Sequence, residues 1–181
     1  MMKKLAFLLI TFIMPVSLSA DNQSDIYQIK ALFLYNFANF IEWPEGAFES
    51  HSDPIRLCLF GDIPFGEFLD EVNGTLIGDR ALNVFRSGKL SEIKAGCHIL
   101  FVGEDKKVDL PKFWNQIKYT YVLSIGEEKG FTDLGGIVNI MRTLDQVQFD
   151  INISNAKAGG LIIGSDILGL ARKIKRNTLS K

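Results

Sequence analysis

Two short apolar runs mark the centre of the predicted fold. The first covers residues 55–60, between Pro54 and Gly61, and the second covers residues 97–103. Apolar runs of this length are typical of strands that are buried on both faces of a parallel sheet. A turn follows the first run and leads into residues 65–72, whose apolar side chains have helical spacing. This part of the sequence therefore predicts a strand, a turn and a helix in succession.

The same alternation of helices and strands continues on both sides of this unit. Residues 26–41 place apolar side chains on one broad helix face, with Ser24 or Asp25 as N-cap and Pro44 as the expected stop. The aromatic residues of this helix are expected to pack on the sheet, and a groove for a ligand or partner is the alternative. Further predicted elements are a strand at 81–86, a short helix at 91–95, a helix at 109–117 and a strand at 119–125.

The last third of the chain has a different pattern. Residues 137–141 and 147–153 form two runs around a polar turn, and the second run alternates apolar residues with Gln148, Asp150 and Asn152. This alternation predicts an antiparallel hairpin with one solvated face. The remaining predicted elements are a helix at 155–158, a strand at 161–163 and a final helix at 165–175.

Together these elements predict an α/β fold. Repeated alternation of strands and helices favours a mostly parallel, twisted sheet with helices on both faces. The C-terminal antiparallel hairpin adds to this sheet. A chain of 181 residues is long enough to build one domain with a sizeable core.

The first twenty residues have the pattern of a secretory signal. Lys3 and Lys4 precede an apolar run at residues 5–16, and small residues follow up to Ala20. We expect residues 1–20 to be a signal peptide that is cleaved near residue 20, with a single exported domain at 21–181. An N-terminal helix buried in the fold is the alternative.

The charge balance excludes one class of partner. Without Lys3 and Lys4 the chain has 18 basic and 21 acidic side chains, a formal charge of −3. A nucleic-acid-binding protein needs a basic surface that displaces counterions from phosphates. We therefore expect no nucleic-acid partner.

The two cysteines of the chain lie in the two central apolar runs. Disulfides persist in exported proteins, so Cys58 and Cys97 are candidates for a bond. In a doubly wound sheet the first strand commonly lies beside the third, which would bring the two sulfurs within reach. Two buried free thiols are the alternative.

The sequence contains no recognisable catalytic constellation. The motifs G-x-S-x-G, G-x-x-x-x-G-K-[ST], H-E-x-x-H and C-x-x-C are absent. The two histidines are His51, in a polar loop, and His98, whose side chain is expected on the strand face opposite to that of Cys97. We therefore predict that the protein is not an enzyme and that it has no catalytic residues, metal site or cofactor.

Several blocks of sequence, in order, resemble one family. The N-terminal blocks are residues 30–44, 58–66 and 96–101. The C-terminal blocks are residues 130–131, 135–137, 147–153, 160–161 and 168–172. Over essentially the whole mature chain they are similar to the YfiR family of periplasmic regulators.

This resemblance implies an exported α/β domain that binds the periplasmic part of a membrane-anchored diguanylate cyclase in the inner membrane. Such a regulator lowers cyclic-di-GMP, and with it attachment and biofilm formation. The resemblance also implies release by redox or envelope stress and by an outer-membrane lipoprotein that sequesters the regulator; a homodimer is a further option. Cys58 and Cys97 occupy the family's disulfide positions, whereas the second cysteine pair that some relatives carry in the C-terminal third is absent.

The hairpin and the final helix supply the hypothetical partner surface. Asp150 and Asn152 are expected to face outward beside the row of Ile151 and Ile153, and Arg172 offers a bidentate donor.

A small-ligand receptor in the periplasm is the alternative function. Its pocket would lie at the carboxyl ends of the strands, near Asp62, Phe65 and Gly103.

Overall fold

The structure is a computed structural model. It describes residues 21–176, with only the backbone for residues 21–25, so the predicted signal peptide and the side chains of the predicted N-caps Ser24 and Asp25 lie outside the described part. The positions inside this range that are not described are Asp62, Pro64, Gly66, Ala95, Lys107, Lys118, Tyr119, Leu144 and Asp145.

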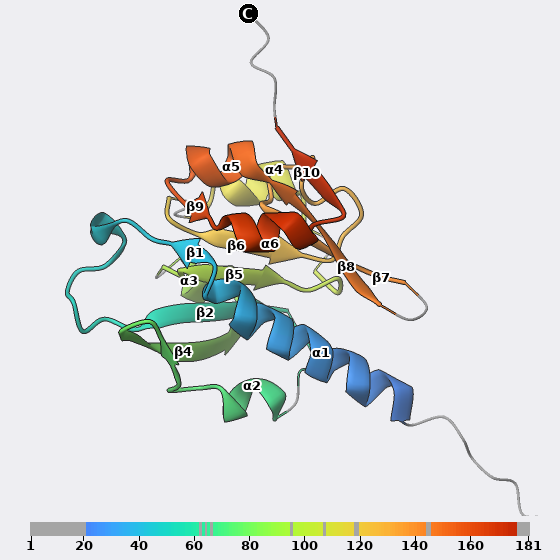
Figure 1. Cartoon of the computed structure of the whole chain (residues 1–181), viewed down its shortest axis with the longest axis horizontal. Coiled ribbons are helices and arrows are strands. Elements are labelled where there is room, and N and C mark those ends of the chain that lie inside the picture. Colours follow the sequence, from blue (N-terminus) through green and yellow to red (C-terminus); the bar gives the residue numbers. More distant parts are fainter. Residues whose placement is uncertain are drawn as a thin grey trace, which may run out of the picture.

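A single sheet forms the centre of the described part (Figure 1). Its strands are β2 (Ile55–Phe60), β3 (Leu76–Ile77), β4 (Arg80–Ser87), β5 (Ile99–Val102), β6 (Leu123–Gly126), β7 (Val138–Arg142), β8 (Val147–Asn152) and β10 (Lys173–Lys175). Their order is β10-β8-β7-β6-β5-β2-β4-β3. Only the pairs β7–β8 and β3–β4 are antiparallel. The mostly parallel sheet and the C-terminal hairpin are therefore confirmed.

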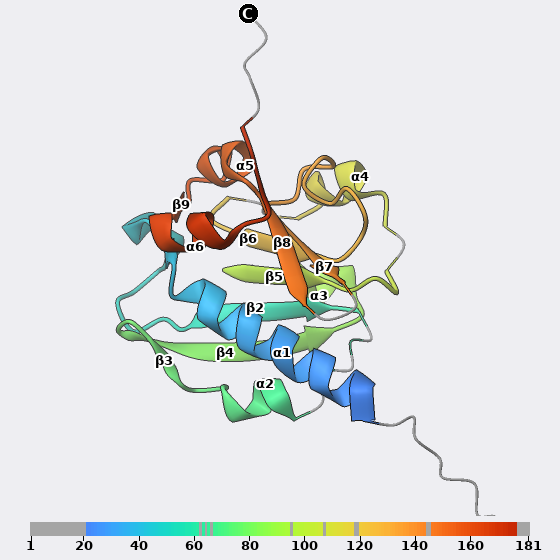
Figure 2. The same cartoon turned by 45° about the vertical axis from the view of Figure 1, so that its right-hand side comes forward.

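Helices cover both faces of this sheet. The helix α1 (Asp21–Ala38) runs across one face, in front of β2 and β4 (Figure 2). The shorter helices are α2 (Phe68–Glu71), α3 (Leu90–Ile93), α4 (Leu110–Trp114), α5 (Ile153–Ala158) and α6 (Ser165–Leu170). A 3-10 turn, η1 (Glu45–Ala47), and a small sheet of β1 (Ile41–Glu42) and β9 (Ile162–Ile163) complete the fold.

Two hydrophobic clusters lie on opposite faces of the sheet. Leu57 and Leu59 of β2 belong to the larger cluster, which includes the inner face of α1. Cys58 and Phe60 of the same strand belong to the second cluster, which includes side chains of α3 and α4. Successive side chains of a strand point to opposite faces, so a strand covered on both sides must be apolar at nearly every position. This explains why the run at residues 55–60 is apolar at every position except Arg56.

Two of the predicted helices end earlier than expected because the residues that follow them pair in strands. The chain leaves α1 at Ala38 and not at residue 41, because Ile41 pairs with Ile163 in the small sheet. The final helix ends at Leu170, and residues 173–175 form β10 beside β8. The main-chain N–H of Arg172 donates to the carbonyl of Phe149 at 2.9 Å. Pairing with β8 thus replaces the last helical turns that the apolar spacing had predicted.

The prediction that one face of the hairpin is solvated is wrong. Asp150 is only 5% exposed, and Asn152 is also buried. The reason is that other segments pack on this face of β8. Arg172, which follows α6, covers Asp150, and Thr132 and Asn155 contact Asn152. The alternation alone assigns these polar side chains to solvent.

A disulfide joins Cys58 and Cys97, whose Cα atoms are 5.9 Å apart. Cys58 lies in β2, and Cys97 immediately precedes the paired neighbour strand β5. The predicted pairing is confirmed. The bond closes a loop of 39 residues that contains α2, β3, β4 and α3.

Removing this bond should destabilise the domain. In the chain-entropy model a loop of this size contributes about 4 kcal/mol to the free energy of unfolding. We expect Cys58→Ala/Cys97→Ala to lower the urea midpoint to that of the reduced wild type. Chemical denaturation with and without dithiothreitol measures this. An unchanged wild-type midpoint on full reduction would contradict it.

Candidate functional site

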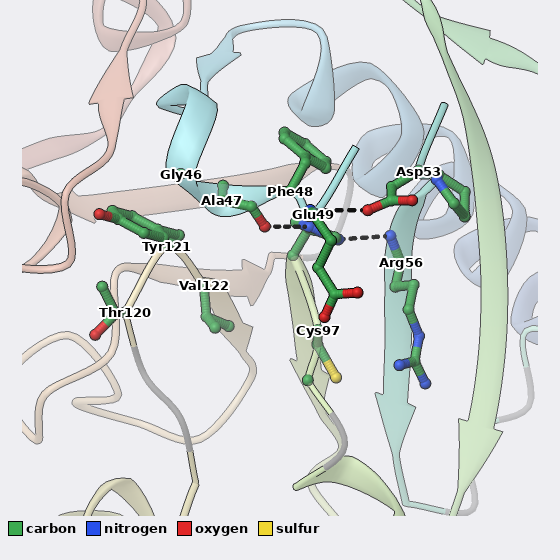
Figure 3. Close-up of a pocket in the computed structure, with 13 residues that line it drawn as sticks. Gly46, Ala47, Phe48, Glu49, Asp53, Arg56, Cys97, Thr120, Tyr121 and Val122 are labelled. Carbon is green, nitrogen blue, oxygen red and sulfur yellow. Dashed lines mark hydrogen bonds between the residues drawn. The ribbon is translucent and has the colours of Figure 1, made fainter. Parts of the chain in front are cut away.

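A cleft of about 340 Å³ opens at the amino ends of β2, β5 and β6. Figure 3 shows its wall, formed by the loop at residues 46–49, by Asp53 and Arg56, and by Cys97, Tyr121 and Val122. One half of the disulfide, Cys97, therefore borders a solvent-filled space, whereas Cys58 is fully buried.

His98 ties the loop to the sheet beside this cleft. Its Nδ1 accepts from the main-chain N–H of Arg56 at 3.0 Å, and its Nε2 lies 3.1 Å from the carbonyl oxygen of Ala47. Since Nδ1 accepts, Nε2 carries the proton and donates to Ala47. The imidazole also stacks on Phe48, with ring centroids 4.4 Å apart. The arrangement uses both nitrogens of the neutral imidazole, so it is structural and leaves no free base.

Arg80 completes the attachment of the loop. Its guanidinium carbon lies 3.6 Å from the centroid of the Phe48 ring, and it donates to the carbonyls of Ser50 and Asp53. Burial lowers the pKa of His98 below its usual 6.5, and the positive charges of Arg56 and Arg80 act in the same direction. The nearby charge of Asp53 and the bond to Ala47 oppose this shift only in part.

The lowered pKa of His98 predicts a pH-dependent stability. The unfolded chain binds this proton more readily than the folded one, so stability should fall as the pH drops below about 6.5. We expect His98→Asn to reduce the change in urea midpoint between pH 7 and pH 5. The control His51→Asn, at an exposed site, should keep the pH dependence of the wild type. Equal slopes in wild type and His98→Asn would contradict the role of His98.

A charged groove of about 770 Å³ lies at the other end of the strands. It follows the carboxyl ends of β5 and β6, at Glu104 and Glu127, and reaches β7, β8 and β10. Lys30 pairs with Glu127, and Lys175 pairs with Asp133. Three further basic side chains of the groove, Lys129, Arg142 and Lys173, form no ion pair within the described part of the chain. We name this surface the charged groove.

The pair of Asp150 and Arg172 forms one wall of the charged groove. Arg172 donates from Nε to Oδ1 at 2.9 Å and from Nη2 to Oδ2 at 2.6 Å. This bidentate contact raises the pKa of Arg172. The arginine side chain is nevertheless 49% exposed, whereas the carboxylate is nearly buried. Asp150 thus acts as a fixed support that orients an exposed guanidinium.

The other residues of the predicted partner surface lie inside the fold. Ile151 is fully buried in the larger hydrophobic cluster. Asn152 caps α5 by accepting from the N–H of Asn155 at 3.0 Å, and it donates to the carbonyl of Thr132. Ile153 begins α5 and is half-buried. Of the predicted set, Arg172 is therefore the residue that offers most surface to a partner.

The two residues of the predicted ligand pocket that the structure describes, Phe65 and Gly103, are both buried. Asp62 lies outside the described residues, and Phe65 is fully buried against Phe101, with ring centroids 5.2 Å apart. Gly103 is buried below the side chains of Ile63 and Asp105. The open space at the carboxyl ends begins one residue further on, at Glu104.

An apolar groove of about 460 Å³ was not located from the sequence. Its walls are Phe33, Asn36, Phe37, Asn39 and Phe40 on one side and Ile167 and Leu170 of α6 on the other, with Val147 and Phe149 of β8 as its floor. We name this surface the apolar groove. The available signal was the aromatic density of residues 33–40. That density is compatible with aromatic rings in the core or in a groove. The structure shows both arrangements, because Phe37 is buried and Phe33 and Phe40 are half-buried.

The fold is shared with solved structures of other α/β proteins. The ABC domain from Streptococcus pneumonia, solved in complex with L-Trp, is 9% identical and superposes with a TM-score of 0.54. A conserved domain protein from Vibrio cholerae O1 biovar eltor gives 9% identity and a TM-score of 0.55. Both matches cover 82% of this chain and 60% of the other, so the chain spans less than two thirds of their length. These likenesses show the fold alone.

The family is defined by sequence. The model of the YfiR/HmsC-like family matches residues 27–172, and the chain belongs to this family. The predicted resemblance is confirmed. Proteins of this family are periplasmic regulators of diguanylate cyclase signalling rather than enzymes. None of the helices in the described part of the chain is both long and apolar enough to cross a membrane.

Proposed function

We propose that this protein is a periplasmic repressor that binds the periplasmic domain of a membrane-anchored diguanylate cyclase and lowers its cyclic-di-GMP output. The observation that carries the proposal is the family match over residues 27–172. An export signal at residues 1–20 would deliver the chain to that compartment. Repression requires that the protein bind the inactive state of the cyclase more tightly than the active one.

The surface around β8 and β10 supports such binding. Arg172 presents a half-exposed guanidinium that Asp150 holds in one orientation. A fixed arginine loses less conformational entropy on binding, and arginine is enriched among residues that dominate binding energy. An outer-membrane lipoprotein that sequesters the regulator would act by covering the same surface, and a homodimer that used it would compete with the cyclase.

Removing Arg172 should weaken the complex. Arg172→Ala alone would leave the buried carboxylate of Asp150 without its cation. We therefore compare the double variant Asp150→Asn/Arg172→Ala with Asp150→Asn alone. We expect capture of the cyclase domain to weaken by about tenfold or more, with a rise in cellular cyclic-di-GMP. Arg86→Ala, which breaks an exposed pair with Asp70, is the control at the other end of the sheet.

Two different failures can be distinguished in this experiment. Undiminished capture and repression by the folded double variant would remove Arg172 from the interface. Absence of capture by the wild type, with unchanged cyclic-di-GMP, would contradict the repressor function itself. Co-purification and cyclic-di-GMP measurement in the same cells provide both readouts.

A small-ligand receptor is the second candidate function. The charged groove favours it, since ligands of parallel α/β sheets bind at the carboxyl ends of the strands. Lys129 and Arg142 would favour a ligand with at least one negative charge.

Citrate is a suitable probe for the receptor function. We expect a receptor to show a saturable rise in melting temperature with citrate, lost in Lys129→Ala/Arg142→Ala and retained in the exposed control Lys94→Ala. A melting temperature that is the same with and without citrate would contradict this binding.

A further inference from the structure

The outer face of α1 lacks charge over most of its length. Between residues 26 and 41 the single charged side chain is Lys30, which is buried and paired with Glu127. The solvent side of the helix instead carries the apolar side chains of Ile29 and Leu32, and Leu32 is 55% exposed. Surface helices of globular proteins normally carry charged residues on the solvent side. An uncharged solvent face next to a groove is typical of a surface that a partner covers.

The apolar groove continues this face towards α6. Leu170 forms its far rim and is 70% exposed. The ring of Phe149 in the floor packs against Phe33 and Phe37 of the α1 wall, at centroid distances of 5.0 and 5.6 Å. Such a cluster is ordered before any partner arrives, so binding costs little side-chain entropy.

The two grooves on either side of β8 differ completely in charge. Neighbouring residues Phe149 and Asp150 point to opposite faces of the strand. All nine residues that line the apolar groove are uncharged. A charged partner side chain buried there would lose its hydration without gaining an ion pair. The occupant must therefore present an uncharged apolar surface.

The shape of the groove favours a helix over an extended segment. The floor strand β8 is paired with β7 along residues 147–151 and with β10 at residues 150–152, so only a short stretch of its edge, before Asp150, is open to an added strand. The walls are helical, α1 on one side and α6 on the other. From Ile29 to the end of α1 the uncharged face measures about 14 Å, which matches two to three turns of a helix.

We propose that the apolar groove and the adjoining face of α1 dock an amphipathic helix of the cyclase's periplasmic domain through an uncharged apolar stripe. This inference rests on the proposed function. The groove selects side chains at i, i+3, i+4 and i+7 of the partner helix, which insert between α1 and α6 above the aromatic floor. Arg172, two residues after Leu170, contacts polar groups at the edge of the same complex.

Charged substitutions at exposed positions test this proposal without disturbing the core. In Leu170→Glu and Leu32→Glu a charge enters the contact, and we expect the Kd for the purified periplasmic domain of the cyclase to rise at least tenfold in each. The matched control is Leu76→Glu, since Leu76 is 64% exposed on β3 at the opposite edge of the sheet. Circular dichroism confirms that each variant folds.

The outcomes separate this inference from the function on which it rests. If the wild type binds the cyclase domain and both groove variants bind as tightly, the groove proposal is overturned and the repressor function stands. If the wild type does not bind at all, both fail. If the groove variants only change the sedimentation coefficient of the protein alone, the groove holds a second copy and the proposal is overturned.

A photo-cross-linker identifies the occupant directly. With p-benzoylphenylalanine at position 170, mass spectrometry should place the cross-link in a helical segment of the cyclase domain whose apolar stripe is free of charge. A cross-link to a charged loop or to another copy of this chain would overturn the proposal.

Discussion

The ion pair between Asp150 and Arg172 holds the C-terminal third of the structure in place. A carboxylate as deeply buried as Asp150 is costly unless a cation stays beside it. Arg172 can fill that position only if the chain returns to β8 immediately after α6. The main-chain bond from Arg172 to Phe149 and the three paired residues of β10 follow from that return. The ion pair therefore sets both the end of α6 and the outer edge of the sheet.

This constraint also creates two unlike surfaces from one strand. Successive side chains of β8 point to opposite faces of the sheet, where Phe149 meets α1 and Asp150 meets Arg172. The apolar groove exists because α6 stops at Leu170, which leaves that residue at the rim. A continued helix would have carried the chain away from β8. The position of Leu170 is thus coupled to the ion pair two residues further on.

The sequence predicts the central sheet well because burial on both faces leaves a simple pattern. The apolar runs that became β2 and β5, the hairpin of β7 and β8, and the partnership of Cys58 with Cys97 all follow from such local patterns. The family resemblance added the partner class. These features depend on residues that are close in sequence or on the common order of strands in α/β folds.

The candidate site was harder to predict because its environment comes from distant residues. Alternation in residues 147–153 separates two faces, yet it cannot show whether solvent or a later strand covers the polar one. The partner of Asp150 lies 22 positions away, in a segment whose apolar spacing suggests a helix. In the same way, the aromatic spacing of α1 does not reveal which rings meet the sheet and which line a groove. Both questions are settled by where α6 and β10 pack.

The position of the disulfide limits how oxidation could influence the partner surface. Cys58 and Cys97 join β2 to the segment before β5, and β6 and β7 separate these strands from β8. The chain has no further cysteine, so the two grooves contain no thiol chemistry of their own. Reduction would therefore reach the grooves only by weakening the sheet that supports them. A redox response of this protein would therefore appear first as a loss of stability. Binding would be lost only as a consequence of that lower stability.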